Sequence, residues 1–204
     1  IQRIHLWCLW ITDEQKKLAE SIPPIKIRIE KVRELRLASR APSTRQKANI
    51  SHRFIQIQSE PKSALLVPTI SSERREYIPI EFITDDTVCS GQTLAIFDSP
   101  TYLFSVLSSS LHNLWVKTVG GRMRTDIRYS SLCYNSFAIP NINEEHEDLL
   151  TKISFTIMDI REKYSDQTFA QLYDPKKMPI DLKQVHLEND KVVDKIVLGK
   201  NGLS

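Results

Sequence analysis

The first third of the chain combines one short apolar run with two stretches of helical spacing. Residues 6–11 are apolar and rich in tryptophan, a composition that favours a buried strand. Thr12 followed by Gln15 forms a capping-box pattern, which predicts a helix as far as about residue 21. A Pro-Pro pair ends that helix, and the apolar positions beyond the pair predict a second helix to about residue 38.

The middle third follows the composition and spacing of β-strands. Four short runs are rich in branched and aromatic residues: 54–57, 64–68, 77–83 and 94–97. Prolines fall in or beside these runs, and because proline cannot donate a hydrogen bond to a strand ladder, they indicate edges, bulges or strand ends. The sequence therefore predicts a sheet in this region.

A helix and then a hairpin are predicted after the sheet. Ser99 followed by Pro100 is a helix start, a stripe of leucines gives the helix an apolar face, and a Gly-Gly pair at position 120 ends it. Residues 123–129 and 132–137 then have the character of two strands. The two serines between these runs predict the turn of a hairpin.

The pattern becomes helical after Pro140. Asn143 is placed to cap a long helix, which has three glutamates in its first turns and an apolar face up to Ile160. A short apolar segment at 169–173 follows, and Pro179 opens a last helix.

These patterns predict an α+β fold in two parts. A mixed β-sheet with packed helices forms a domain over residues 1–140, and a small helical domain covers residues 141–204. A chain of 204 residues suits one large domain with such an appendage. It begins at Ile1, just before an apolar run, so we expect it to be a piece of a larger protein.

Composition adds few constraints. The chain is 41% hydrophobic and 26% charged, as ordinary globular domains are, and its net charge of +3 does not by itself imply nucleic acid. No apolar segment is long enough to span a bilayer, and no signal peptide is visible. The three cysteines are far apart and form neither a zinc pattern nor a disulfide framework, so we expect reduced thiols in a cytoplasmic protein.

One block of the sequence is strongly basic. Nine Lys and Arg residues lie between Lys26 and Arg53, and only Glu30 and Glu34 oppose them. The block is either a solvated helix face followed by a loop, or a surface that contacts phosphates.

A second charged pattern lies in the predicted strand 123–129 and just before it. Because side chains alternate along a strand, Arg122, Arg124, Asp126 and Arg128 are expected on one face. Arginine can donate two hydrogen bonds to guanine and aspartate can accept one from cytosine, so such a row fits the major groove of DNA. The alternative is a solvated strand face with a surface ion pair.

Signatures of catalysis are absent from the sequence. It holds no phosphate-binding glycine-rich loop and no nucleophile elbow, and its five histidines lack the spacing of metal ligands. We therefore predict no catalytic residue and no metal site in this chain.

Several motifs in one order resemble the target-recognition domain of MmeI-like (type IIL) restriction–modification enzymes. The most specific is Gly-Gly-Arg-Met-Arg-Thr-Asp-Ile-Arg-Tyr-Ser at 120–130, followed by Tyr134-Asn135 and Pro140. Others are the segments 6–11, 32–39, 71–79, 103–115, 172–179 and 186–194. In place of the family's Pro-Trp-Pro, this sequence has Ala-Ile-Pro at 138–140.

The resemblance implies that Arg124, Asp126 and Arg128 read bases of double-stranded DNA. We hypothesise that Arg124 and Asp126 read one G·C pair, with the arginine on the guanine. We assign backbone positioning to four residues and to parts of the basic block as a hypothesis: Arg74, Arg75, Lys117 and Arg122. The resemblance also implies linked nuclease and adenine-N6 methyltransferase domains, which would bind Mg²⁺ and S-adenosylmethionine outside this chain.

Two alternatives stay open. Basic strands also suit an RNA-binding accessory domain, although we expect the three tryptophans to be buried and so not to stack on single strands. A small hydrolase built on His112 or His186 is the other alternative, but no nucleophile and oxyanion donors accompany these histidines in the sequence.

Overall fold

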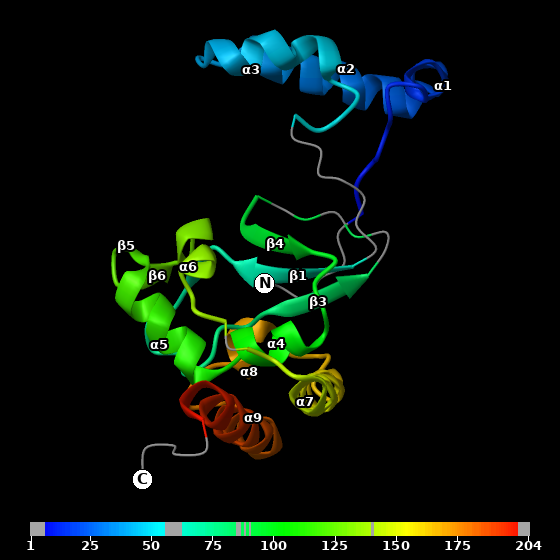
Figure 1. The fold of residues 1–204 in the computed structure, drawn as a ribbon. Coiled ribbons are helices and arrows are strands. Elements are labelled where there is room, and N and C mark those ends of the chain that lie inside the picture. The colour runs from blue at the N-terminus through cyan, green and yellow to red at the C-terminus, as the bar shows by residue number, and fades with distance from the viewer. Residues whose placement is uncertain are drawn as a thin grey trace. The chain divides into compact units, whose positions relative to one another are not determined.

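The computed structural model describes residues 7–55, 63–84, 87, 89, 91–139 and 141–199. The chain divides into two compact units. His5–Ser59 form one, called here the helical unit, and Ile1–Ile4 with Glu60–Ser204 form the other, called the main unit. Figure 1 shows the elements of both.

The helical unit consists of helices, two of which begin with proline. Its elements are α1 (Lys16–Ser21), α2 (Pro23–Leu37), α3 (Pro42–Gln46) and the 3-10 helix η1 (Lys47–Ile50). Thr12 and Gln15 exchange the two capping-box hydrogen bonds, at 3.2 and 3.3 Å, although α1 begins only at Lys16. The second helix is confirmed: α2 starts at the predicted Pro-Pro pair.

The predicted buried strand at 6–11 is wrong within the residues described. Residues 7–11 form no strand, and the side chain of Trp7 is 96% exposed. Trp10 is half-buried and stacks on Phe54 with ring centroids 5.7 Å apart. Composition alone does not distinguish an aromatic contact of this kind from strand pairing.

The first sheet of the main unit has the strand order β3-β1-β4 and is antiparallel throughout (Figure 1). Its strands are β1 (Ser63–Pro68), β3 (Glu81–Thr84) and β4 (Thr93–Phe97). The central strand β1 is buried from Ala64 onwards, which explains why its sequence is continuously apolar. Residues 77–80 are buried without pairing as a strand, because Pro79 interrupts the run. Of the predicted strand 54–57, residues 54 and 55 form no strand and the rest lie outside the described residues.

The second sheet has the order β2-β6-β5 and is also antiparallel. It is formed by β2 (Ile70–Ser71), β5 (Gly121–Met123) and β6 (Asp126–Arg128). The α+β class is thus confirmed, but both sheets are antiparallel where we predicted a mixed sheet. The predicted strand 132–137 is wrong, because residues Ser131–Asn135 form helix α6. A segment of this length is too short for periodicity to separate one helical turn from a strand.

The helix predicted from Pro100 is two helices, α4 (Tyr102–Leu107) and α5 (Ser110–Val119). Ser109 separates them in an extended conformation, and its hydroxyl accepts a hydrogen bond from the backbone N–H of His112 at 3.2 Å. Serine competes with helical hydrogen bonds in this way and favours caps over helix interiors.

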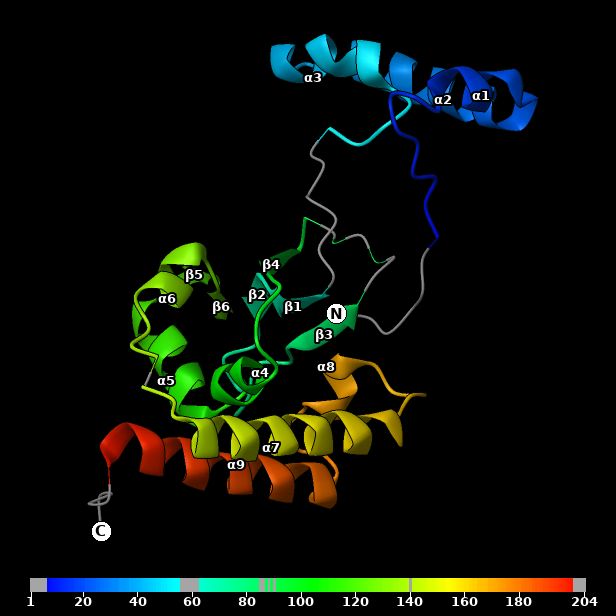
Figure 2. The same ribbon diagram turned by 45° about the vertical axis from the view of Figure 1, so that its right-hand side comes forward.

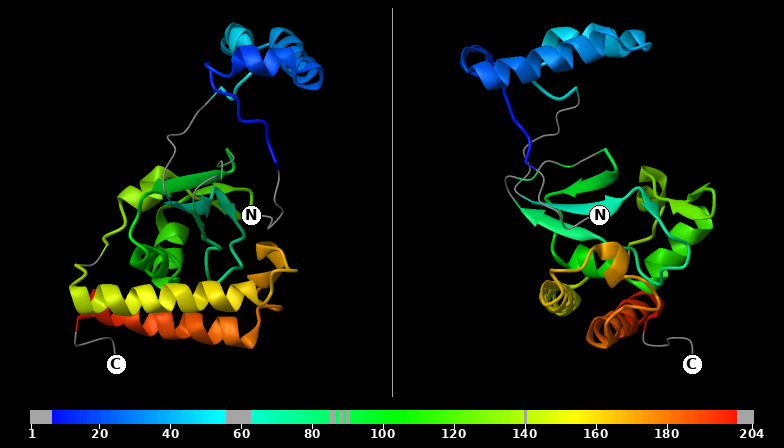
Figure 3. Two further views of the ribbon diagram at one scale, coloured as in Figure 1. Left: turned by 90° about the vertical axis from the view of Figure 1, so that its right-hand side faces the viewer. Right: turned by 180° about the vertical axis from the view of Figure 1, so that it is seen from behind.

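The last third is helical as predicted, with α7 (Glu144–Glu162), α8 (Phe169–Leu172) and α9 (Ile180–Leu198). The Asn143 side chain caps α7 by accepting from the His146 N–H at 2.8 Å. Helices α7 and α9 run side by side (Figures 2 and 3). None of the helices in the described residues has both the length and the apolar character that crossing a membrane requires.

One hydrophobic core joins the sheets to the C-terminal helices. It contains Leu65 of β1, Phe104 of α4, Leu150 of α7 and Leu182 of α9, all fully buried. The domain boundary predicted at 140/141 falls between α6 and α7, and helices on both sides of it pack on this core.

Buried polar groups attach α7 and α9 to the rest of the main unit. Arg161 of α7 is 1% exposed, donates to the carbonyl oxygen of Ile80 at 2.7 Å and lies over the ring of Phe169. Asp190 of α9 accepts from the Tyr77 hydroxyl at 2.9 Å and from the first backbone N–H of α5 at 2.8 Å. The carboxylate of Asp190 therefore satisfies the first backbone N–H of α5, which has no partner within its own helix.

Candidate nucleic-acid interface

Strands β5 and β6 form a tight hairpin that carries the charged residues predicted to read bases. Met123 pairs with Asp126, so only Arg124 and Thr125 form the turn. Arg124 adopts a positive φ of 59°, a conformation that glycine adopts without strain and other residues rarely adopt. The prediction of one continuous strand over 123–129 is therefore wrong, because the chain reverses direction at Arg124.

The reversal changes where the charged side chains lie. Asp126 and Arg128 flank Ile127, which is 2% exposed, and so they share the face opposite to it. Arg122 pairs directly with Ile127 across the strands and therefore lies on the Ile127 side of the hairpin. The predicted row of four on one face is thus wrong: Asp126 and Arg128 remain on a common face, and Arg124 is exposed in the turn.

A buried histidine anchors the hairpin to α5. The imidazole of His112 is fully buried, and burial lowers its pKa to about 4, although the hydrogen bond to the Leu107 carbonyl opposes this shift. The ring is therefore neutral near pH 7, with Nδ1 donating to Leu107 at 2.8 Å. Nε2 is then the acceptor for the hydroxyl of Tyr129, at 3.2 Å. Tyr129 directly follows Arg128 of β6, so this bond holds the end of the hairpin.

The segment 72–76, which follows β2, lies beside the hairpin. Arg122 pairs with Glu73 at 3.3 Å, with both side chains about half exposed. Arg75 is half-buried; burial lowers the pKa of its guanidinium, and the carboxylates of Asp126 and Asp174 oppose that effect. Arg75 is thus in the electrostatic neighbourhood of one of the predicted base readers.

Helix α5 fixes the backbone of the same segment. The ammonium group of Lys117 donates to the carbonyl oxygen of Arg75 at 3.0 Å. The Asn113 amide donates to the carbonyl oxygens of Arg75 and Glu76, at 2.9 and 2.6 Å. The structure thus brings the seven predicted site residues onto the hairpin, the segment 72–76 and α5, and adds Glu73 and Asn113, which we had not predicted. Glu73 lies within the motif 71–79, but the sequence does not show its pairing with Arg122.

The structure shows where the residues of the two alternatives lie. His112 and His186 are fully buried, and the Nε2 atom of each lies within hydrogen-bond distance of a tyrosine hydroxyl. The distance is 3.1 Å between His186 Nε2 and the Tyr173 oxygen. No group of three potential ligands among His, Cys, Asp and Glu is close enough to hold a metal ion in the described part of the chain. The tryptophans are less buried than predicted, since Trp7 is exposed and Trp10 and Trp115 are half-buried.

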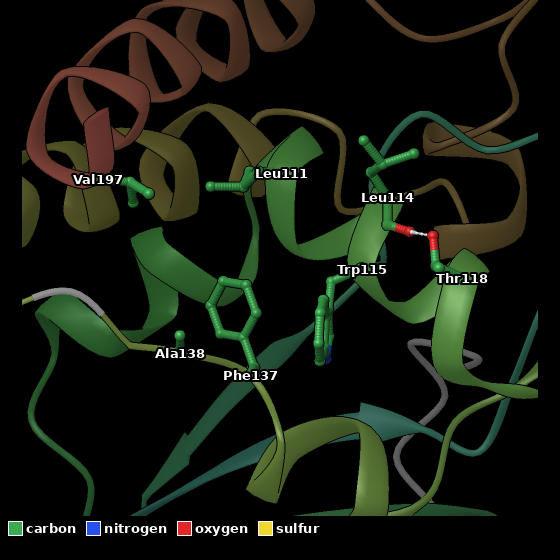
Figure 4. A pocket seen from close by; sticks show the side chains of 7 residues that line it. All are labelled: Leu111, Leu114, Trp115, Thr118, Phe137, Ala138 and Val197. Carbon is green, nitrogen blue, oxygen red and sulfur yellow. Dashed lines mark hydrogen bonds between the residues drawn. The ribbon is translucent and has the colours of Figure 1, made fainter. Parts of the chain in front are cut away.

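An apolar pocket of about 280 Å³ opens between α5, the segment after α6 and the end of α9. Figure 4 shows Trp115, Phe137 and Val197 around it. Its one side-chain hydroxyl, on Thr118, donates to the carbonyl oxygen of Leu114 at 2.9 Å (Figure 4). The lining therefore holds no acid, base or activated nucleophile.

Residues 1–141 match the family described as "MmeI, target recognition domain". The chain belongs to this family. Residues 142–204 match the description "MmeI, C-terminal domain". The two matches meet close to the boundary expected from the sequence, in the segment that joins α6 to α7.

Two relatives are similar to this chain over most of its length. A Bacillus subtilis (strain 168) protein named DNA methyltransferase A is 35% identical over 190 residues, which is 93% of this chain and 22% of that protein. A solved structure, titled as that of the type IIL restriction–modification enzyme MmeI in complex with DNA, superimposes with a TM-score of 0.86 at 38% identity. The superimposed region covers 93% of this chain and 26% of the chain in the MmeI structure. The chain thus spans about a quarter or less of the length of either relative.

Proposed function

We propose that this chain recognises a specific sequence of double-stranded DNA. The observation that carries the proposal is the exposed β5–β6 hairpin of a target-recognition family member, with Arg124 in its turn and Asp126 and Arg128 on one face. The related MmeI structure contains DNA, which supports a duplex as the ligand. Arginine and aspartate have the donors and acceptors that the edges of a G·C pair require.

Base reading falls to Arg124, Asp126 and Arg128 in this proposal. The turn places Arg124 and Asp126 two residues apart at the tip, where Arg124 would bind guanine and Asp126 the paired cytosine. Of the residues predicted to position the DNA backbone, four lie in the main unit: Arg74, Arg75, Lys117 and Arg122. Arg122 would exchange its exposed bond to Glu73 for a phosphate, and exposed ion pairs of this kind are weak enough to be exchanged.

The rest of the protein would carry the chemistry. We infer that the chain positions DNA for an adenine-N6 methyltransferase domain in the same polypeptide, with an endonuclease domain also linked. Those domains would use S-adenosylmethionine and Mg²⁺, and the whole enzyme would act in the cytoplasm on an adenine flipped out of the duplex. The likeness to DNA methyltransferase A supports this inference.

A charge exchange tests the reading of the G·C pair. In the full-length protein, Arg124→Glu combined with Asp126→Arg should change one position of the methylated site from G·C to C·G. A bidentate contact contributes about 1–3 kcal/mol of discrimination, or roughly 5- to 150-fold. Methylation-site sequencing measures the change, and a charge exchange between exposed residues of the main unit, Asp166→Lys with Lys176→Glu, is the control.

An unchanged site at every position in the first variant contradicts the assignment of these residues. The choice of ligand is tested separately, by gel shift of the unmodified protein. Duplex DNA should bind more tightly than single-stranded DNA or RNA of the same sequence. Tighter binding of RNA would instead support the accessory RNA-binding domain.

A further inference from the structure

The charge of this chain is unevenly divided between its two units. The helical unit, His5–Ser59, contains eleven Lys and Arg residues and five Asp and Glu residues, which gives it a net charge of +6. The whole chain carries +3, so the remaining residues, which include the recognition hairpin, carry −3. Because long-range attraction to a polyanion follows local charge, the helical unit is the part of the chain most suited to phosphate.

Some cations of the basic block have internal roles. The buried guanidinium of Arg36 donates to the carbonyl oxygens of Lys47 and Ile50 in η1 and of Arg53 beyond it, at 2.8–2.9 Å. Arg45 donates to two carbonyl oxygens in the segment between α2 and α3, at 2.9 Å each. Arg53 pairs with Asp13 at 3.1 Å. These three arginines hold the helical unit together, so their guanidinium groups are already engaged in hydrogen bonds or an ion pair within the unit.

The other six cations of the block are exposed, and in the part of the chain that the structure describes none is within ion-pair distance of a carboxylate. They are Lys26, Arg28, Lys31, Arg33, Arg40 and Lys47. Four of them are on α2, whose buried side is marked by Ile29 and Arg36. At 100° per residue, Lys26 and Arg33 lie on one flank of that side, Arg28 lies on the other flank, and Lys31 lies nearly opposite the buried side. Long basic side chains on both flanks of a helix can contact several phosphates without reading any base.

We propose that the helical unit is a second DNA-contacting surface, which binds the phosphate backbone of the duplex through these exposed cations independently of sequence. This inference rests on the proposed function, since the duplex is the one that the hairpin recognises. The helical unit is joined to the main unit at both ends, at residues 4–5 and 59–60. A duplex held by the hairpin is therefore present at high effective concentration for the helical unit.

The inference makes a quantitative prediction about salt. Each cation that neutralises a phosphate contributes about 0.9 to the slope of log affinity against log salt concentration. The fourfold variant Lys26→Gln, Arg28→Gln, Lys31→Gln and Arg33→Gln should thus flatten the slope by up to about 3.6. Affinity should fall by the same factor on the recognised duplex and on a scrambled duplex, because these contacts carry no sequence information.

The experiment measures dissociation constants of the full-length protein for both duplexes from 50 to 300 mM salt, roughly the range over which counterion release is strong. A control variant removes the same charge from exposed positions of the main unit: Lys152→Gln, Lys163→Gln, Lys176→Gln and Lys177→Gln. Its slope should match that of the unmodified protein. Two double variants, Lys26→Gln with Arg33→Gln and Arg28→Gln with Lys31→Gln, should each flatten the salt slope by half as much. They keep the test available if the fourfold variant does not fold.

Three outcomes overturn the inference. An unchanged slope in the α2 variants shows that these cations do not contact phosphate, and an equal change in the control shows an effect of net charge alone. Loss of methylation activity with unchanged binding to both duplexes would mean that the exposed face of α2 contacts another domain of the protein. The proposed function fails on different evidence, namely an unchanged methylated site after the Arg124–Asp126 exchange.

Discussion

Acid should destabilise this protein through two histidines that are buried in the neutral form. His112 and His186 are both fully buried. Burial is the main cause that lowers the pKa of His112 to about 4 and that of His186 to about 3, and nearby Arg161 lowers the pKa of His186 further. The Tyr77 and Tyr173 rings pack on His186, with ring centroids 4.2 and 5.5 Å from the centroid of the imidazole.

The sign and size of the effect follow from proton linkage. In the unfolded chain each histidine titrates at about pH 6.5, so unfolding below that pH takes up a proton that the folded state does not bind. Stability is therefore fully present above pH 6.5 and falls as the pH drops towards the folded-state values. The loss is about 1.4 kcal/mol per pH unit for each histidine. Between pH 6.5 and 5 it amounts to about 2 kcal/mol each, or about 4 kcal/mol for the pair.

Urea unfolding followed by circular dichroism at pH 6.5, 6.0, 5.5 and 5.0 measures this slope. His186→Asn, which cannot titrate, should show about half the slope of the unmodified chain, whatever its own stability at pH 6.5. Carboxylates also begin to protonate in this range, but they do so in both proteins, so the difference in slope isolates the histidine. Equal slopes in the two proteins would refute the reasoning.

Two further predictions concern the hairpin. Tyr129→Phe removes the hydroxyl that donates to His112 and leaves this buried nitrogen without a partner. The free energy of unfolding, measured by urea titration, should therefore fall by about 1–2 kcal/mol. An unchanged value would show that the bond does not anchor the hairpin. Arg124→Gly relieves the strain of a positive φ, which costs residues other than glycine about 1–2 kcal/mol of folding free energy. Glycine in turn loses more backbone entropy on folding, which costs about 0.5–1 kcal/mol. We expect equal or slightly higher stability by the same titration together with relaxed specificity by methylation-site sequencing, and a clear loss of stability would contradict this.

The long elements of the fold were predictable from the sequence because several signals agree at their ends. Helix α7 has a capping asparagine, acidic first turns and a regular apolar face, and α2 starts at a Pro-Pro pair. Short elements were not predictable in the same way. The segment 131–135 is one helical turn whose backbone accepts a hydrogen bond from Trp115, and this contact depends on the tertiary structure.

The candidate site shows the same division. Alternating charges at 122–128 and the motif 71–79 were the sequence signals for the site, and the structure brings these two segments together through the pairing of β2 with β6. The face on which each charge lies was not predictable, because it depends on where the hairpin turns. Local sequence allows a strand through Arg124, whereas the register with Ile127 requires the turn there.

The position of Asp190 has a practical consequence for anyone who wishes to graft this specificity onto another enzyme. The Asp190 carboxylate on α9 accepts hydrogen bonds from the Tyr77 hydroxyl and from the first backbone N–H of α5. Tyr77 lies just beyond the segment that adjoins the hairpin. The neighbouring Asn189 donates to the Ser105 carbonyl oxygen. A graft cut at residue 141, where the two family matches meet, would remove the partners of these groups together with the helices that cover the core. The transplantable piece extends through α9, and both matched regions should be exchanged together.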